Sequence, residues 1–143
     1  MKRAILSAAL AVAFVVGVSA QDTPNFAGTW KPADSFNRTR ITVEGSKMTV
    51  TITLAGNSDS TVYMLDGTPS KKTIKGPGGK PIEQVYTSKW EGNVLVTTIT
   101  TAAPDPMIEK RWLDSDGTMK VERTIVLKGK PETSPTSVFR RIE

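Results

Sequence analysis

Arg123 is the residue whose position most clearly suggests chemistry. In an expected β-strand over residues 118–128 it shares one face with four apolar residues: Met119, Val121, Ile125 and Leu127. An arginine on an apolar face is costly unless an anion pairs with it. One interpretation is an anchor inside a cavity, where the guanidinium binds a carboxylate or phosphate through two parallel hydrogen bonds. The other is an internal ion pair with a glutamate, or a β-bulge that turns the side chain outward.

Lys110 raises the same question, because it shares strand parity with Ile108 and Trp112. A lysine can also extend its ammonium group outward while its stem covers apolar surface. The apolar residues predicted to face the interior are Met48, Val50, Ile52, Met64, Trp112, Met119 and Val121. They are the walls of a cavity if the interior is open, and a packed core if it is filled. The methionines among them would adapt to varied apolar ligands.

Composition excludes several classes of site. The 143 residues contain no Cys and no His. Disulfides and zinc sites built from thiolates and imidazoles are therefore impossible. Ser-His-Asp and Cys-His catalysis both need an imidazole base, and a globin-like haem needs a proximal His.

The acidic residues form no recognisable catalytic or metal site. Residues 114–117 (Asp-Ser-Asp-Gly) lack the later ligands of a calcium loop and predict a hairpin turn. Glu109 and Glu122 are expected on polar strand faces, as solvated partners of Lys and Arg. The 19 Lys and Arg residues exceed the 14 Asp and Glu residues but are scattered along the chain. We therefore expect no enzyme activity, no cofactor, no metal and no nucleic-acid partner.

Residues 1–20 have the pattern of a cleaved secretory signal. Lys2 and Arg3 precede an apolar run over residues 5–16, and Val18-Ser19-Ala20 is a small-residue cleavage site. A retained membrane helix is the alternative, but it needs about 20 apolar residues. No Cys follows the cleavage site to carry a lipid. We expect a mature domain over residues 21–143, periplasmic or extracellular, with no integral membrane segment.

The rest of the chain predicts antiparallel strands. Met48, Val50, Ile52 and Leu54 alternate with threonines, which is typical of a half-buried strand. We expect nine strands, over residues 26–31, 40–43, 48–54, 60–66, 83–90, 94–101, 107–114, 118–128 and 136–142. Residues 76–81, 103–106 and 131–135 are rich in Gly and Pro and predict loops. The fold class is all-β: an up-and-down meander of about 8–10 strands closed into one barrel, because closure buries one face and removes the edges.

Several motifs are similar to those of calycins, the superfamily of lipocalins and fatty-acid-binding proteins. Residues 25–31 (Asn-Phe-Ala-Gly-Thr-Trp-Lys) resemble the opening Gly-x-Trp signature, and residues 89–92 (Lys-Trp-Glu-Gly) resemble a hairpin of fatty-acid-binding proteins. Residues 121–129 and 136–141 look like that family's last two strands.

The resemblance implies structural roles for Gly28 and Trp30 at a closed end of the barrel, with Arg141, or alternatively Arg140, packed across the Trp30 ring. Two family features are missing. Residues 32–39 are too short for the helical lid of fatty-acid-binding proteins. Their terminal Arg-x-Tyr pair, which holds a carboxylate, corresponds here to Ser137-x-Phe139. The chain therefore resembles a bacterial, secreted, lipocalin-like domain.

These observations favour a non-enzymatic protein that binds a small hydrophobic or amphipathic ligand in a barrel cavity, with Arg123 orienting the polar end. The alternative is a packed barrel that acts on a protein partner, as an envelope inhibitor or adaptor, through loops such as residues 70–81. A third possibility is an enzyme that uses carboxylates alone.

Overall fold

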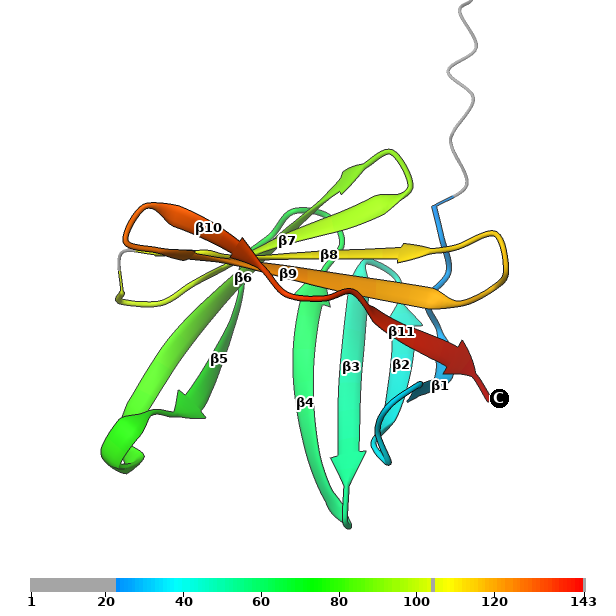
Figure 1. Cartoon of the computed structure of the whole chain (residues 1–143), viewed down its shortest axis with the longest axis horizontal. Helices are drawn as coiled ribbons and strands as arrows, with labels where there is room; N and C mark the ends of the chain where they lie inside the picture. Colours follow the sequence, from blue (N-terminus) through cyan, green and yellow to red (C-terminus); the bar gives the residue numbers. More distant parts are fainter. Residues whose placement is uncertain (1–22, 104, 143) are drawn as a thin grey trace, which may run out of the picture.

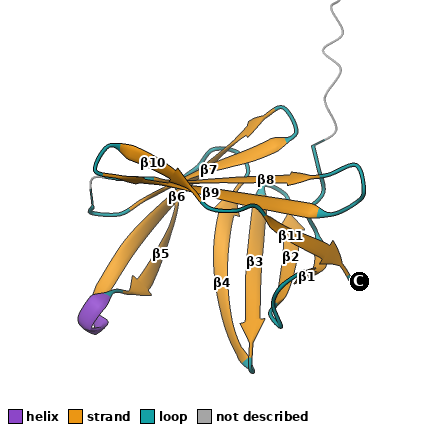
Figure 2. Ribbon diagram, viewed as in Figure 1, coloured by secondary structure: helices purple, strands orange, loops and turns teal. Residues whose placement is uncertain are grey.

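The computed structural model describes residues 23–103 and 105–142, so the predicted signal segment lies outside the described part. The fold is all-β and antiparallel, as predicted (Figures 1 and 2). Its strands are β1 (Gly28–Pro32), β2 (Arg38–Glu44), β3 (Lys47–Leu54), β4 (Asn57–Met64), β5 (Ser70–Lys75), β6 (Pro81–Glu91), β7 (Val94–Thr100), β8 (Met107–Leu113), β9 (Met119–Leu127), β10 (Lys130–Thr133) and β11 (Ser137–Arg141). A short 3₁₀ turn, η1 (Pro77–Gly79), connects β5 to β6. No described helix has the length and apolar character needed to cross a membrane.

The strands form one sheet that curls into a nearly closed barrel. Their order is β4-β3-β2-β1-β11-β9-β8-β7-β6-β5, and β10 pairs with β9 outside this path. The pairing of β1 with β11 joins the first and the last described strands. Within the described residues β4 and β5 share no backbone ladder. They meet through side chains: Ser70 Oγ donates to the Val62 carbonyl at 2.5 Å, and Lys72 Nζ contacts Asp59 Oδ2 at 2.5 Å.

Two strands were expected to be loops, which is why the barrel has eleven strands rather than about nine. Residues 70–75, expected to belong to a long loop, are β5, with Lys71 and Lys75 facing outward. Residues 130–133 are β10, although they include Pro131. A proline has no N–H for a ladder and is tolerated on an edge strand, and β10 pairs only with β9 among the described strands. The turn predicted at residues 114–117 is confirmed, because the Asp114 amide donates to the Thr118 carbonyl at 2.8 Å.

One end of the barrel is filled and closed by aromatic residues. Trp30 is fully buried, and its Nε1–H donates to the Phe26 carbonyl at 2.8 Å. Phe26 in turn stacks on Trp90, with ring centroids 5.9 Å apart. The Arg141 guanidinium carbon lies 4.6 Å from the Trp30 centroid, a cation–π distance. Gly28 begins β1 with φ of 139°, a backbone conformation that strains residues with a side chain.

Candidate ligand-binding site

The other half of the barrel interior is not filled. It contains a cavity of about 320 Å³. Its apolar lining comprises Val50, Ile52, Ile74, Ile99, Met107, Val121 and Phe139, and its polar lining comprises Thr39, Asp59, Thr61, Tyr63, Lys72, Gln84, Tyr86, Arg111 and Arg123. A second cavity of about 330 Å³ lies next to it and shares the lining residues Thr39, Ile52, Val121, Arg123 and Phe139. The two cavities therefore meet beside Arg123.

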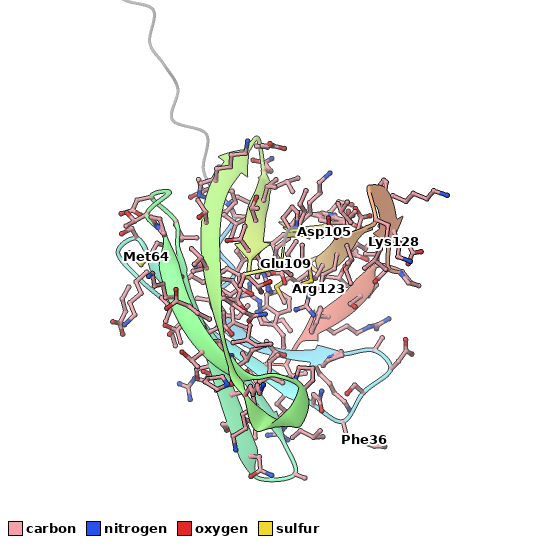
Figure 3. All side chains as sticks on the ribbon, turned by 90° about the vertical axis from the view of Figure 1, so that its left-hand side faces the viewer. Phe36, Met64, Asp105, Glu109, Arg123 and Lys128 are labelled. Atoms are coloured by element: carbon pink, nitrogen blue, oxygen red, sulfur yellow. The ribbon has the colours of Figure 1, made fainter. Side chains whose placement is uncertain are left out.

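A buried carboxylate organises the charged wall of the cavity. Glu109 on β8 is 1% exposed. Its Oε1 accepts a hydrogen bond from Arg111 Nη2 at 2.9 Å, and its Oε2 accepts one from Arg123 Nε at 3.0 Å. Figure 3 shows Glu109 and Arg123 side by side in the interior. Two guanidinium groups face one carboxylate, so this cluster carries one unbalanced positive charge.

The two arginines keep Glu109 ionised. Burial by itself would raise the pKa of the Glu109 carboxyl, but Arg111 and Arg123 outweigh it and hold that pKa below its ordinary value. Burial also opposes the charged form of Arg123, yet Glu109 raises the pKa of the Arg123 guanidinium. The cluster is thus permanently charged at neutral pH.

Arg123 and Arg111 have different roles in this cluster. The Arg123 side chain is 51% exposed and lines both cavities. Among the described residues it hydrogen-bonds through Nε, which leaves its terminal nitrogens accessible from the cavity. Arg111 is buried, with its guanidinium carbon 5.7 Å from the Tyr63 ring centroid. Its Nε is buried without a partner in the described residues. Arg123 is therefore the cation that a ligand can reach, and Arg111 supports it through Glu109.

The opposite wall of the cavity is polar and internally hydrogen-bonded. Lys72 Nζ, only partly exposed, donates to Thr61 Oγ1 at 2.9 Å as well as to Asp59. The Tyr86 hydroxyl donates to Gln84 Oε1 at 2.7 Å. Burial raises the pKa of the Tyr86 hydroxyl, so this group stays a neutral donor. This wall offers hydrogen-bonding groups whose charges already balance.

Comparison with known proteins gives a likeness of fold. No protein-family model matches the sequence, and no curated protein matches it. Among solved structures, the chain is similar to the REP1-NXSQ fatty acid transporter. The identity is 14%, the match covers 82% of this chain and 96% of the other, and the TM-score is 0.60. A tyrosine-to-phenylalanine mutant of that transporter matches at 13% identity over 81% and 97% of the two chains, with a TM-score of 0.52. At these identities the likeness concerns the barrel architecture alone.

Most residues predicted on β3 and β9 face the interior. Met48 and Met119 are fully buried and belong to the packed closed end. Val50 and Val121 are buried and line the cavity. Ile52 is 39% exposed and lines both cavities, nearer the open end. A role for these residues in ligand binding stays a prediction.

The prediction that Met64 faces the interior is wrong. Tyr63 is buried and Met64 lies on the outer face of β4, as Figure 3 shows. In the register of β3 with β4, the interior residue Met48 lies opposite Tyr63. Residues that lie opposite each other share a face of the sheet, so Tyr63 must point inward and its neighbour outward.

The predictions for Lys110 and Trp112 are wrong for the same reason. Lys110 is exposed, and Trp112 is half-buried on the outer face. Glu109 pairs with Arg123 across the two strands, and Arg111 pairs with Val121. Because β9 turns Val121 and Arg123 inward, β8 turns Glu109 and Arg111 inward too. The expectation that Glu109 is a solvated residue on a polar face is therefore also wrong.

The sequence pattern missed the residues that complete the site: Tyr63, Lys72, Tyr86, Glu109 and Arg111. The sequence did contain a signal for two of them, Glu109 and Arg111. The turn at residues 114–117 fixes the register of β8 with β9, and this register places Glu109 opposite Arg123. Of the two interpretations of Arg123, the internal ion pair is present, and the side chain also lines the cavity.

Proposed function

We propose that the protein is a secreted, non-enzymatic carrier of the calycin type, which binds a small amphipathic acid inside its barrel. The ligand's carboxylate binds the terminal nitrogens of Arg123. Its apolar part packs along the inward faces of β3 and β9. The observation that carries this proposal is the unfilled interior of about 320 Å³, on whose wall Arg123 is held by the described residues through its Nε, with its terminal nitrogens left for a ligand.

Charge balance supports an anionic ligand. Arg111 and Arg123 are both paired with Glu109, so one positive charge has no counterpart in the cluster. A bound carboxylate would neutralise it, and a hydrogen bond to a charged group contributes about 1.5–3 kcal/mol. Because the Arg123 Nε is held by Glu109, the guanidinium is pre-oriented and loses little freedom on binding.

The inward faces of β3 and β9 set the ligand's orientation. Along β3, exposure rises from Met48, which is fully buried, through Ile52 to Leu54, which is 53% exposed. On β9 the same trend runs from Met119 to Leu127, which is 51% exposed. On β9, Ile125 and Leu127 lie beyond Arg123 towards the open end. The acid therefore enters with its carboxylate first and leaves its apolar tail towards the mouth.

The solved structures with this fold that are named fatty acid transporters support the choice of ligand class. The signal-like residues 1–20 support export to the periplasm or the cell exterior. The alternative function, a packed barrel that binds a protein, needs a filled interior and a long loop over residues 70–81. Most of that segment is β5, and the interior holds a cavity.

The test compares an acid with the matching alcohol. Isothermal titration calorimetry would measure the binding of dodecanoic acid and of dodecanol to the wild type and to Arg123→Gln and Arg123→Lys. We expect the wild type to bind the acid roughly 10–100-fold more tightly than the alcohol, which is the value of one charged hydrogen-bonded contact. Arg123→Gln should lose this preference, and Arg123→Lys should keep part of it because the charge remains.

Lys110→Gln is the matched control, because Lys110 is a cation on the outer face of the same hairpin. It should bind both ligands as the wild type does. Equal affinity of the wild type for acid and alcohol, or an unchanged preference in Arg123→Gln, would disprove the assigned role of Arg123.

A further inference from the structure

Three loop tips of the barrel point to the same side of the molecule. They connect β1 to β2, β3 to β4 and β5 to β6, and all lie at the lower edge of Figure 1. We call residues 34–38, 54–57 and 75–80 the loop-tip surface. Asn37 on the first tip, and Pro32 beside it, line the second cavity of about 330 Å³, so this surface lies next to the mouth of the barrel.

The loop-tip surface exposes large apolar side chains. Phe36 is 95% exposed, and Figure 3 shows it at the edge of the molecule, away from the interior. Leu54 is 53% exposed on the neighbouring tip. Phe36 and Leu54 lie on separate tips and line neither of the two cavities, so they do not form a groove for a peptide or a helix. They suit a partner that is broad, soft and apolar beneath its surface.

The charges around these apolar residues are mainly positive. Arg38, Lys75 and Lys80 are exposed on the loop-tip surface, against one exposed acid, Asp34. The next acid, Asp59, is already paired with Lys72. The turns at the other end of the barrel mix acids, at Asp66, Glu91, Asp114 and Asp116, with bases such as Lys47, Lys89 and Lys120. On the loop-tip surface, by contrast, three bases face one acid, so a net positive charge lies where Phe36 and Leu54 are exposed.

We propose that the loop-tip surface binds the surface of an anionic lipid bilayer. Phe36 and Leu54 insert at the boundary between headgroups and acyl chains, and Arg38, Lys75 and Lys80 contact lipid phosphates. Basic residues near an anionic surface each contribute about 1 kcal/mol, and an inserted aromatic ring adds apolar burial. This docking goes beyond the carrier function and needs no ligand in the cavity.

Vesicle flotation tests the proposal. Protein from expression of the full chain, with the same N-terminus verified in every variant by mass spectrometry, is mixed with phosphatidylcholine vesicles or with vesicles containing 30% phosphatidylglycerol. We expect binding to the anionic vesicles, weakened by salt. Lys75→Gln with Lys80→Gln should reduce affinity more than tenfold, at roughly fivefold per lysine. Phe36→Ser should reduce it by a similar factor.

The controls are matched in kind and lie at the other end of the barrel. Ile142→Ser replaces an apolar residue that is 44% exposed, and Lys47→Gln with Lys89→Gln removes two exposed cations. Both should bind vesicles as the wild type does. Arg123→Gln should also retain vesicle binding, which separates this proposal from the carrier function.

A site-specific probe gives a second readout. The chain has no Cys, so Phe36→Cys and Ile142→Cys each carry one environment-sensitive label. The label at position 36 should shift to the blue on anionic vesicles, and the label at position 142 should not. The proposal is overturned by equal binding to both vesicle types, by losses in the loop-tip variants no larger than in the controls, or by self-association through Phe36 without vesicle binding.

Discussion

Replacing Glu109 with Gln should weaken the fold and strengthen the binding of an acid. Glu109 is 1% exposed and is the hydrogen-bonded counterion of Arg111, which is 4% exposed. Gln keeps the size of the side chain but leaves Arg111 buried without a charge partner. Breaking a buried ion pair costs about 3–5 kcal/mol. The half-exposed Arg123 is hydrated from the cavity, so we assign the cost mainly to Arg111 and expect the lower end, about 3 kcal/mol.

The affinity for a carboxylate ligand should change in the opposite direction. In Glu109→Gln the cluster carries two uncompensated positive charges instead of one, so it attracts an anionic ligand at Arg123 more strongly. We expect dodecanoic acid to bind at least as tightly as in the wild type. A saturating concentration should restore stability, because a ligand that binds only the folded state stabilises it by RT ln(1 + [L]/Kd).

Urea unfolding followed by tryptophan fluorescence, with and without the acid, measures both effects. Glu122→Gln is the control, because Glu122 lies on the opposite face of β9 from Arg123. It should change the free energy of unfolding by less than about 0.5 kcal/mol. An unchanged stability in Glu109→Gln, or a folded Glu109→Gln that binds the acid more weakly than the wild type, would refute the reasoning.

Three further predictions concern pH, the closed end and the gap between β4 and β5. The pKa of Glu109 is lower in the folded protein than its ordinary value of 4.5 in the unfolded chain. The ionised carboxylate therefore stabilises the fold fully above pH 4.5, and this stabilisation is lost as the pH falls through the lowered folded pKa. The free energy of unfolding, measured against pH in acid, should depend less on pH in Glu109→Gln than in the wild type. Arg141→Met should lower the free energy of unfolding by about 0.5–1 kcal/mol, because it removes the cation from the face of Trp30. Arg141→Met should cost less in a Trp30→Leu background, which has no aromatic ring at this position, and an undiminished cost there would contradict this origin. Lys72→Met should lower the free energy of unfolding by about 1–2 kcal/mol, because the partly buried Lys72 bridges β4 and β5. The control Lys71→Met removes an exposed ion pair with Glu83 and should cost under about 1 kcal/mol. Equal losses in the two variants would contradict a bridging role for Lys72.

Alternation alone was enough to predict the strands that have one apolar face. Met48, Val50, Ile52 and Leu54 alternate with threonines, and β3 turns that set inward as expected. The barrel follows from the succession of such strands, because closure is the way a small antiparallel sheet buries one face and limits its edges.

The orientation of β8 could not be predicted from hydrophobicity. Ile108 and Trp112 mark one face as apolar, but the other face carries Glu109 and Arg111, which are buried because they neutralise each other. A buried ion pair reverses the hydrophobic pattern of a strand. Only the cross-strand register, which places Glu109 opposite Arg123, identifies the inward face.

The two missed strands have a different cause. β5 carries Lys71, Lys72 and Lys75 within six residues, and its inward lysine is tolerated because Asp59 and Thr61 bind it. β10 includes Pro131 and pairs with β9 as an edge strand. Neither segment has the apolar alternation of a strand. Each is held by its hairpin with the neighbouring strand, β6 or β9, and by side-chain contacts such as those of Lys72, which the propensities of single residues do not contain.

The central claim is that a ligand's carboxylate binds beside Arg123, and carbon-13 NMR of dodecanoic acid labelled at the carboxyl carbon tests it most directly. The chemical shift of the bound carboxyl, followed from neutral to acid pH, reports the pKa of the bound ligand. The account predicts that this pKa lies below that of the free acid, because the guanidinium favours the charged form, and that it rises in Arg123→Gln. A bound carboxyl with a pKa above that of the free acid would place it in an apolar part of the barrel and contradict the account.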